Sequence, residues 1–216
     1  MKGVIPTKTM LAIPCMDTVP VGFMQSILYL DKPPGTSACF NANSLVYDSR
    51  NLLSLQAIES GFDRVLWLDS DMTFHPDTLT RLSATMDKLE CHMVTGVYVK
   101  RRPPFSPVLY SDLSEPHRLP DGSLSSSIAP YTDYPRSHPF TAAGCGFGCV
   151  MTSVRLLKRI WDKFGPAFNP LPWCGEDIAF CHRVNLLGEE VWCDPSVQCG
   201  HIGTYIYTPG RSENEE

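Results

Sequence analysis

Two aspartates directly after an apolar run are the first residues in this sequence whose spacing could bind a metal. Asp69 and Asp71 flank Ser70 and follow Val65–Leu68, a run of apolar side chains without polar alternation. Such a run is typical of a strand buried on both faces, as in a parallel sheet covered by helices. In open α/β sheets the ligand crevice lies at the carboxyl ends of the strands. Two carboxylates there can bind Mg²⁺ or Mn²⁺, although a solvated acidic turn would show the same pattern.

A second acidic pair, Glu176 and Asp177, stands at the start of a predicted helix that ends at Gly188. Acidic side chains in a first helical turn are favoured by the helix dipole, so an ordinary helix start would explain them. The alternative is that one carboxylate acts as a general base toward a bound hydroxyl group. Both interpretations place the pair at a helix N-terminus.

His201 is a candidate metal ligand near the end of the chain. Gly200 and Gly203 flank it and leave room for its ring in a tight turn. A lone histidine is usually structural, but imidazole is also a common metal ligand.

Alternating glycines form another distinctive segment. Gly144, Gly146 and Gly148 are separated by single residues, without the G-x-G-x-x-G spacing of dinucleotide sites or the lysine of a Walker loop. The pattern therefore indicates a close approach of the backbone to a ligand or to another strand.

The elements that must position these residues alternate between strand and helix. Apolar runs and helical spacing predict strands at 9–13, 37–40, 65–68, 93–97 and 190–193, and helices at 23–30, 45–60, 76–89, 153–164 and 176–187. Pro14 is expected to break the first strand. Arg50 and Asn51 lie within the second helix and, taken alone, suit an exposed polar pair. The order predicts an α/β fold: a three-layer α/β/α sandwich with a mostly parallel central sheet.

We expect the 216 residues to form one domain, 1–216. Residues 102–139 contain eight prolines, which predicts a long loop with at most one irregular hairpin around 106–110. The acidic tail, 210–216, is expected to fray.

Composition limits the function classes. A hydrophobic content of 43% and a charged content of 19% indicate a globular protein, and the net charge of −5 argues against an extended nucleic-acid surface. Lys100–Arg102 is the only basic cluster, and it suits a solvated loop or a phosphate contact. The sequence shows no transmembrane run and no signal peptide. Nine cysteines without a secretion signal are expected to be reduced, which predicts a cytoplasmic location.

Taken in order, these motifs resemble a nucleotide-sugar glycosyltransferase of the GT-A fold, similar to family 2. Small members of this kind occur in bacteria and their phages. The resemblance covers nearly the whole chain outside 102–139 and is carried by the following residues: Pro14 and Asp17, Arg50–Asn51, Val65–Met72, Val94–Tyr98, the alternating glycines, Glu176–Asp177 and Gly200–His201.

The resemblance implies a metal site and a donor site. Asp71 would bind Mn²⁺ or Mg²⁺, which bridges the donor diphosphate, and His201 would complete the metal site. Asp69 would support the metal or the ribose. The remaining donor-binding residues would be Pro14, Asp17, Arg50 and Ser70. UDP-sugars are the commonest donors of this fold.

The resemblance also implies catalytic and acceptor residues. Asp177 matches the general base of inverting members, with Glu176 beside it, whereas Gly144, Gly146 and Trp173 would face the sugar and the acceptor. Retaining members share the paired aspartates and the late histidine, so inversion depends on Glu176 and Asp177. The acceptor could be a glycan, a protein hydroxyl or a hydroxylated nucleobase.

Two alternatives come from other classes. A zinc-binding module could use cysteines and histidines in the last third, although no C-x₂-C pair exists; the candidates are Cys174, Cys181, His182, Cys193, Cys199 and His201. A nucleotidyltransferase would release pyrophosphate, but it usually has a glycine-rich, lysine-bearing N-terminal loop that this sequence lacks.

Overall fold

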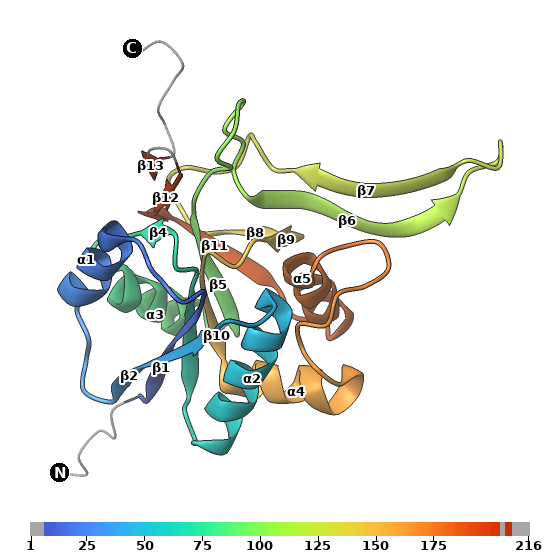
Figure 1. Cartoon of the computed structure of the whole chain (residues 1–216). Coiled ribbons are helices and arrows are strands. Elements are labelled where there is room, and N and C mark those ends of the chain that lie inside the picture. Colours follow the sequence, from blue (N-terminus) through green and yellow to red (C-terminus); the bar gives the residue numbers. More distant parts are fainter. Residues whose placement is uncertain (1–6, 204–205, 209–216) are drawn as a thin grey trace.

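A seven-stranded sheet forms the centre of the computed structural model, which describes residues 7–203 and 206–208. The predicted frayed tail, 210–216, lies outside the described residues. The strands follow the order β2-β1-β3-β10-β5-β11-β8 (Figure 1). Their bounds are β1 Thr9–Cys15, β2 Thr36–Ala42, β3 Arg64–Leu68, β5 Met93–Val97, β8 Phe140–Ala142, β10 Cys149–Ser153 and β11 Val191–Gln198.

Most strands of this sheet run in one direction. Strand β1 is parallel to β2 and β3, and β5 is parallel to β11. Strand β10 lies antiparallel between β3 and β5, so β5 runs the same way as β3; β8 is antiparallel to β11. The predicted mostly parallel sheet is confirmed. The antiparallel insertion of β10 was not predicted.

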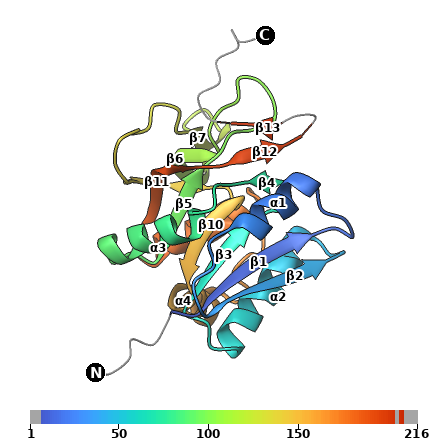
Figure 2. The same cartoon turned by 90° about the vertical axis from the view of Figure 1, so that its left-hand side faces the viewer.

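Helices cover both faces of the sheet (Figure 2). Helices α1 (Val21–Tyr29) and α3 (Thr78–Leu89) pack on one face, where their apolar side chains share a core with Leu66 and Leu68. Helices α2 (Val46–Glu59), α4 (Val154–Phe164) and α5 (Glu176–Leu186) cover the other face, with Val65 and Trp67. The predicted three-layer α/β/α sandwich is therefore confirmed.

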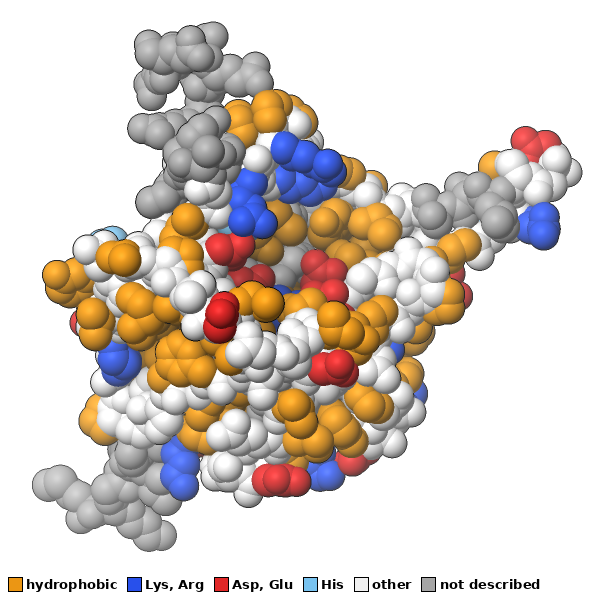
Figure 3. Space-filling model, in the orientation of Figure 1, with side chains coloured by type: hydrophobic (Ala, Val, Ile, Leu, Met, Phe, Trp, Pro, Cys, Tyr) orange, Lys and Arg blue, Asp and Glu red, His pale blue; other side chains and the backbone are white. Residues whose placement is uncertain are grey.

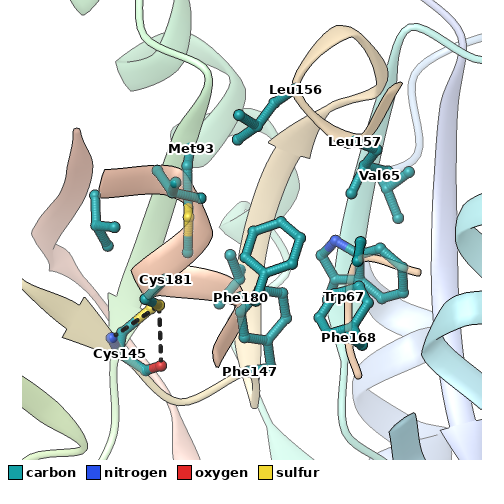
Figure 4. Close-up of a cluster of buried hydrophobic side chains, with 14 of the residues drawn as sticks. Val65, Trp67, Met93, Cys145, Phe147, Leu156, Leu157, Phe168, Phe180 and Cys181 are labelled. Carbon is teal, nitrogen blue, oxygen red and sulfur yellow. Dashed lines mark hydrogen bonds between the residues drawn. The ribbon is translucent and has the colours of Figure 1, made fainter. Parts of the chain in front are cut away.

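Strand β3 connects the two core layers because its side chains alternate between them. Its apolar side chains from Val65 to Leu68 are fully buried, as expected for a strand covered on both faces. Figure 4 shows Trp67 among the rings of Phe147, Phe168 and Phe180. The Trp67 and Phe168 ring centroids are 5.0 Å apart, and the indole N–H donates to Thr152 Oγ1 at 2.9 Å. The indole therefore buries its apolar area without losing a hydrogen bond.

Two expectations about local structure were wrong. Strand β1 continues through Pro14 to Cys15, because its pairing with β3 ends at Ala12 and the missing N–H interrupts no bond on that side. Residues 102–139 are not one long loop: β6 (Leu109–Arg118) and β7 (Leu124–Pro130) form an antiparallel arm that projects from the body (Figure 1). Its strands pair mainly with each other and expose much of β6, so the apolar alternation of a half-buried strand is absent.

No helix among residues 7–203 and 206–208 is long and apolar enough to cross a membrane. All nine cysteines are free thiols.

Candidate active site

A cavity of about 470 Å³ opens where β1, β3 and β5 end. It contains both acidic pairs found in the sequence, Asp69 with Asp71 and Glu176 with Asp177. Figure 3 shows acidic side chains gathered around a hollow in this face, with Lys and Arg side chains beside them. The volume lies within the range of small-molecule sites. This cavity is the candidate active site.

Arg50 connects the two acidic pairs from helix α2. Its Nη2 donates to Asp69 Oδ1 at 2.7 Å and its Nη1 to Glu176 Oε1 at 2.6 Å. The guanidinium carbon lies 5.3 Å from the Phe147 ring centroid and 5.8 Å from that of Phe168, and the side chain is 3% exposed. Burial raises the pKa of Asp69, and the Arg50 charge opposes that rise.

The interpretation of Arg50 and Asn51 as an exposed pair was therefore wrong. Asn51 is also buried, accepts from the Phe168 N–H at 2.8 Å and donates to Asn169 Oδ1 at 3.0 Å. Both side chains contact segments more than a hundred residues later in the chain, which local periodicity could not reveal.

A small second sheet brings His201 to Asp71. Strand β12 (Gly200–Ile202) pairs with β4 (Met72–Thr73) and with β13 (Ile206–Tyr207), and the Ile202 N–H donates to the Asp71 carbonyl at 2.7 Å. His201 Nε2 then lies 3.4 Å from Asp71 Oδ2. Its Nδ1 lies 2.9 Å from the Val99 carbonyl, to which it can only donate, so Nε2 carries the free lone pair in the neutral ring.

Asp71 also has a cationic partner, because Arg101 Nη1 lies 3.0 Å from the same Oδ2 atom. Burial alone would raise the pKa of Asp71. The charge of Arg101, together with the hydrogen bond and charge that His201 supplies when its ring is protonated, outweighs burial, so the pKa lies below its usual value. The carboxylate is thus held ionised.

The donor atoms fit a divalent cation in part. Asp71 and His201 present a carboxylate oxygen and an imidazole nitrogen to one point, a pair that suits Mn²⁺ with other positions left for water or phosphate. In this structure Arg101 contacts the same Asp71 oxygen. Asp69 instead points an oxygen at Arg50, and no cluster of three or more His, Cys, Asp or Glu ligands is assembled within the described part of the chain.

Asp177 and Glu176 occupy the first turn of α5, after Gly175 at the N-cap, but their surroundings differ. Glu176 is bound to Arg50, whereas Asp177 Oδ1 accepts only from the Ile178 N–H, at 2.7 Å, among the described contacts. Burial, followed by the charge of Glu176, raises the pKa of Asp177. Asp177 is therefore the carboxylate of the pair that has no ion-pair partner among the described residues.

The structure brings together most of the predicted donor and catalytic residues. Those that line the cavity are Pro14, Arg50, Asp69, Ser70, Asp71, Glu176 and Asp177. His201 lines an adjoining cavity, and Asp17, Gly144, Gly146 and Trp173 line neither. Asp17 is exposed, and the Trp173 ring lies edge-on to His182, with centroids 5.3 Å apart.

The alternating glycines pack against protein instead. A Cβ on Gly146 would lie 2.2 Å from Tyr98 Oη, and one on Gly144 would lie 2.8 Å from Leu113 Cδ1. The expected close backbone approach is therefore to neighbouring elements. The contacts with Tyr98 bring its ring to the site, where the hydroxyl oxygen accepts from the Gly148 N–H at 3.2 Å. Tyr98 was missed as a site residue, although its position directly after strand 93–97 was a signal.

The cysteines and histidines of the zinc alternative are dispersed. Cys181 contacts Cys145, with a Cys145 N to Cys181 Sγ distance of 3.4 Å, and His182 contacts Glu115 at 3.0 Å. Cys193 belongs to one core layer and Cys199 to the other. A shared zinc ion would need these layers to rearrange.

The three-layer sandwich, with an acidic site at the carboxyl ends of its strands, belongs to the GT-A fold class, as matches to solved structures show. Two examples among the solved structures that share this fold are A197 from STIV and GalNAc-T7. A197 from STIV superposes with a TM-score of 0.66 at 15% identity, over 97% of this chain and 100% of that chain. GalNAc-T7, solved with UDP, GalNAc and Mn²⁺, gives a TM-score of 0.57 at 10% identity, over 97% of this chain but 45% of that one. No family model and no curated protein matches the sequence.

Proposed function

We propose that this protein is a metal-dependent glycosyltransferase that moves a sugar from a nucleoside-diphosphate sugar to an acceptor hydroxyl. The proposal rests on one observation: Asp71 and Asp177 line the same cavity but have different surroundings. Asp71 faces an imidazole nitrogen, as a metal ligand does, while Asp177 has a raised pKa and no cationic partner among the described residues. The sequence motifs support a likeness to family 2.

Asp71 and His201 would hold the Mn²⁺ or Mg²⁺ ion. When bound, such a cation supplies Lewis-acid stabilisation to the negative charge on the departing nucleoside diphosphate. The fixed Nδ1–H contact with the Val99 carbonyl orients the His201 ring for this role. The neighbour solved with UDP and Mn²⁺ supports UDP as the first donor base to test.

Asp177 is proposed as the general base that accepts the proton of the acceptor hydroxyl. A base is most effective when its pKa lies near the working pH, and the raised pKa of Asp177 moves it in that direction. Glu176 is less suited, because its carboxylate is bound to Arg50. In this scheme Arg50 positions Glu176 and Asp69, and attack opposite the leaving group inverts the anomeric centre.

The proposed test combines binding and product release. Thermal unfolding is measured with nucleoside diphosphates and nucleoside-diphosphate sugars, with and without Mn²⁺. A ligand that binds only the folded state raises the midpoint temperature of unfolding. Release of nucleoside diphosphate from the stabilising sugar donor is then measured.

Asp71→Asn is expected to abolish the metal-dependent shift. Asp177→Asn is expected to keep the shift and lose transfer to acceptors, which are screened as glycans, protein hydroxyls and hydroxylated nucleobases. Release of pyrophosphate instead of a nucleoside diphosphate would contradict the proposal, as would the absence of any metal-dependent shift.

A further inference from the structure

A second cavity, of about 380 Å³, adjoins the active site and is lined by cations. Lys100, Arg101 and Arg102 form part of its wall together with His201, and Tyr98 lines both cavities. In Figure 3 Lys and Arg side chains lie directly beside the acidic hollow. This is the basic cluster of the sequence, and the proposed mechanism gives it no role.

The loop that carries the cluster is closed by backbone hydrogen bonds. The Lys100 N–H donates to the Ser106 carbonyl at 2.9 Å, and the Val108 N–H donates to the Tyr98 carbonyl at 3.0 Å. Val99 and Pro107 form an antiparallel bridge between these bonds. The loop is therefore pre-formed, which reduces the entropy lost when its side chains bind a ligand.

The three cations are not equally neutralised. Arg101 contacts Asp71 Oδ2 and donates to the Ile202 carbonyl, both at 3.0 Å, with its side chain 47% exposed. Lys100 lies 5.9 Å from the Tyr110 ring centroid, and no carboxylate in residues 7–203 or 206–208 pairs with Lys100 or Arg102. A cavity with uncompensated cations attracts an anion, and guanidinium groups match the geometry of phosphate oxygens.

Arg101 occupies the atom that a metal would use. The guanidinium and His201 Nε2 both face Asp71 Oδ2, at 3.0 and 3.4 Å. A divalent cation held between Asp71 Oδ2 and His201 Nε2 would lie close to the Arg101 guanidinium, and the two positive charges would repel each other. This repulsion favours a movement of Arg101 away from Asp71 when a cation binds, and its half-exposed side chain can turn into the cavity that Lys100 and Arg102 line.

We propose that Arg101 is an internal counter-cation of Asp71 that exchanges with the divalent cation and then binds the diphosphate of the donor, together with Lys100 and Arg102. This inference rests on the proposed function. The exchange makes metal binding and nucleotide binding mutually reinforcing. Whichever ligand binds first breaks the Arg101–Asp71 contact, so the second ligand binds without that free-energy cost.

The exchange predicts opposite effects of one substitution on two affinities. In Arg101→Gln the affinity for Mn²⁺ alone is expected to rise roughly two- to fivefold, because a half-exposed ion pair no longer competes. The affinity of the Mn²⁺-loaded protein for a nucleoside diphosphate is expected to fall about tenfold or more, because a charge-assisted hydrogen bond is lost. A residue that only supports the loop would not separate the two affinities in this way.

Calorimetric titration at fixed ionic strength measures both affinities, first with Mn²⁺ and then with the nucleoside diphosphate that binds the wild type most tightly. Arg102→Gln removes the same charge near the cavity without breaking a contact with Asp71, so it is expected to weaken nucleotide binding and leave Mn²⁺ binding unchanged. Arg118→Gln, at the end of β6 on the projecting arm, is expected to change neither.

The outcomes separate the two proposals. If the wild type binds a nucleoside diphosphate with Mn²⁺ but Arg101→Gln changes both affinities in the same direction, or neither, the exchange is wrong and the proposed function stands. The exchange would also be wrong if Arg101→Gln and Arg102→Gln raised the affinity for Mn²⁺ equally, because the removal of any nearby positive charge would then explain the effect. If the wild type binds no nucleoside diphosphate, both proposals fail.

Discussion

Replacing Arg50 with glutamine is expected to destabilise the fold, because it leaves Asp69 and Glu176 without their shared cation. Breaking a buried ion pair costs about 3–5 kcal/mol when the remaining charge has no access to water. Here the Asp69 and Glu176 side chains keep 31% and 19% exposure. Water therefore screens part of the loss, and we expect the free energy of unfolding to fall by about 2–3 kcal/mol.

Urea denaturation of the ligand-free protein measures this loss directly. In a thermal scan it corresponds to a lower midpoint by about 4–12 °C for a chain of this size. Arg155→Gln is a matched control, because Arg155 is exposed on α4. It is expected to change the free energy of unfolding by less than about 0.5 kcal/mol.

A double variant, Arg50→Gln with Glu176→Gln, tests the electrostatic reason for the loss. Removing the carboxylate charge with the cation is expected to recover part of the stability, giving a coupling free energy of about 1 kcal/mol or more. The ion pairs of Arg50 do not explain its effect on stability if the losses in unfolding free energy of the two single variants simply add. The same holds if Arg50→Gln is as stable as the wild type. Packing against Phe147 and Phe168 would then remain as its role.

Three further predictions concern Asp177 and Gly146. If the proposed function is correct, Asp177→Asn is expected to slow glycosyl transfer about 10²–10⁴-fold. It should not lower the thermal unfolding midpoint at pH 7, because a carboxylate with a raised pKa destabilises the fold when ionised, and an equal loss of donor binding would contradict the assigned role. The transfer rate should fall as pH drops through the raised pKa of Asp177, and Glu176→Gln should move this limb to lower pH, since Glu176 raises that pKa; rate profiles of both proteins check the shift. Gly146→Ala is expected to destabilise the fold by about 1–3 kcal/mol in urea, because its Cβ would lie 2.2 Å from Tyr98 Oη, whereas Gly22→Ala, with neighbours at 3.5 Å, should not.

Much of the fold could be predicted because the strand signals are local. Strand β5 has the predicted bounds 93–97, and the apolar run before Asp69 is β3, buried on both faces. The paired aspartates could be placed at the sheet edge for the same reason, since a strand end fixes where the next side chains lie. Whether Asp69 binds a metal stays a prediction, and in this structure it contacts Arg50.

The missed features depend on contacts between distant residues. The family resemblance placed Arg50 at the donor site, but its burial was missed, because it depends on the approach of Glu176, 126 residues later. The strand order of the sheet could not be predicted for the same reason. Strand β10 begins with the apolar residues Cys149, Val150 and Met151, but nothing local indicates that it inserts between β3 and β5. The β6–β7 arm was missed because its strands lack an apolar face, so hydrophobic periodicity gives no signal.

The position of β10 has a consequence for synthesis on the ribosome. Strands β3 and β5 are complete by residue 97, yet β10, which joins them, ends at residue 153. During the interval the growing chain carries two apolar strands with unpaired edges, and such edges promote pairing with other chains. The order of translation also means that the candidate active site cannot form until α5, which carries Glu176 and Asp177, has been synthesised.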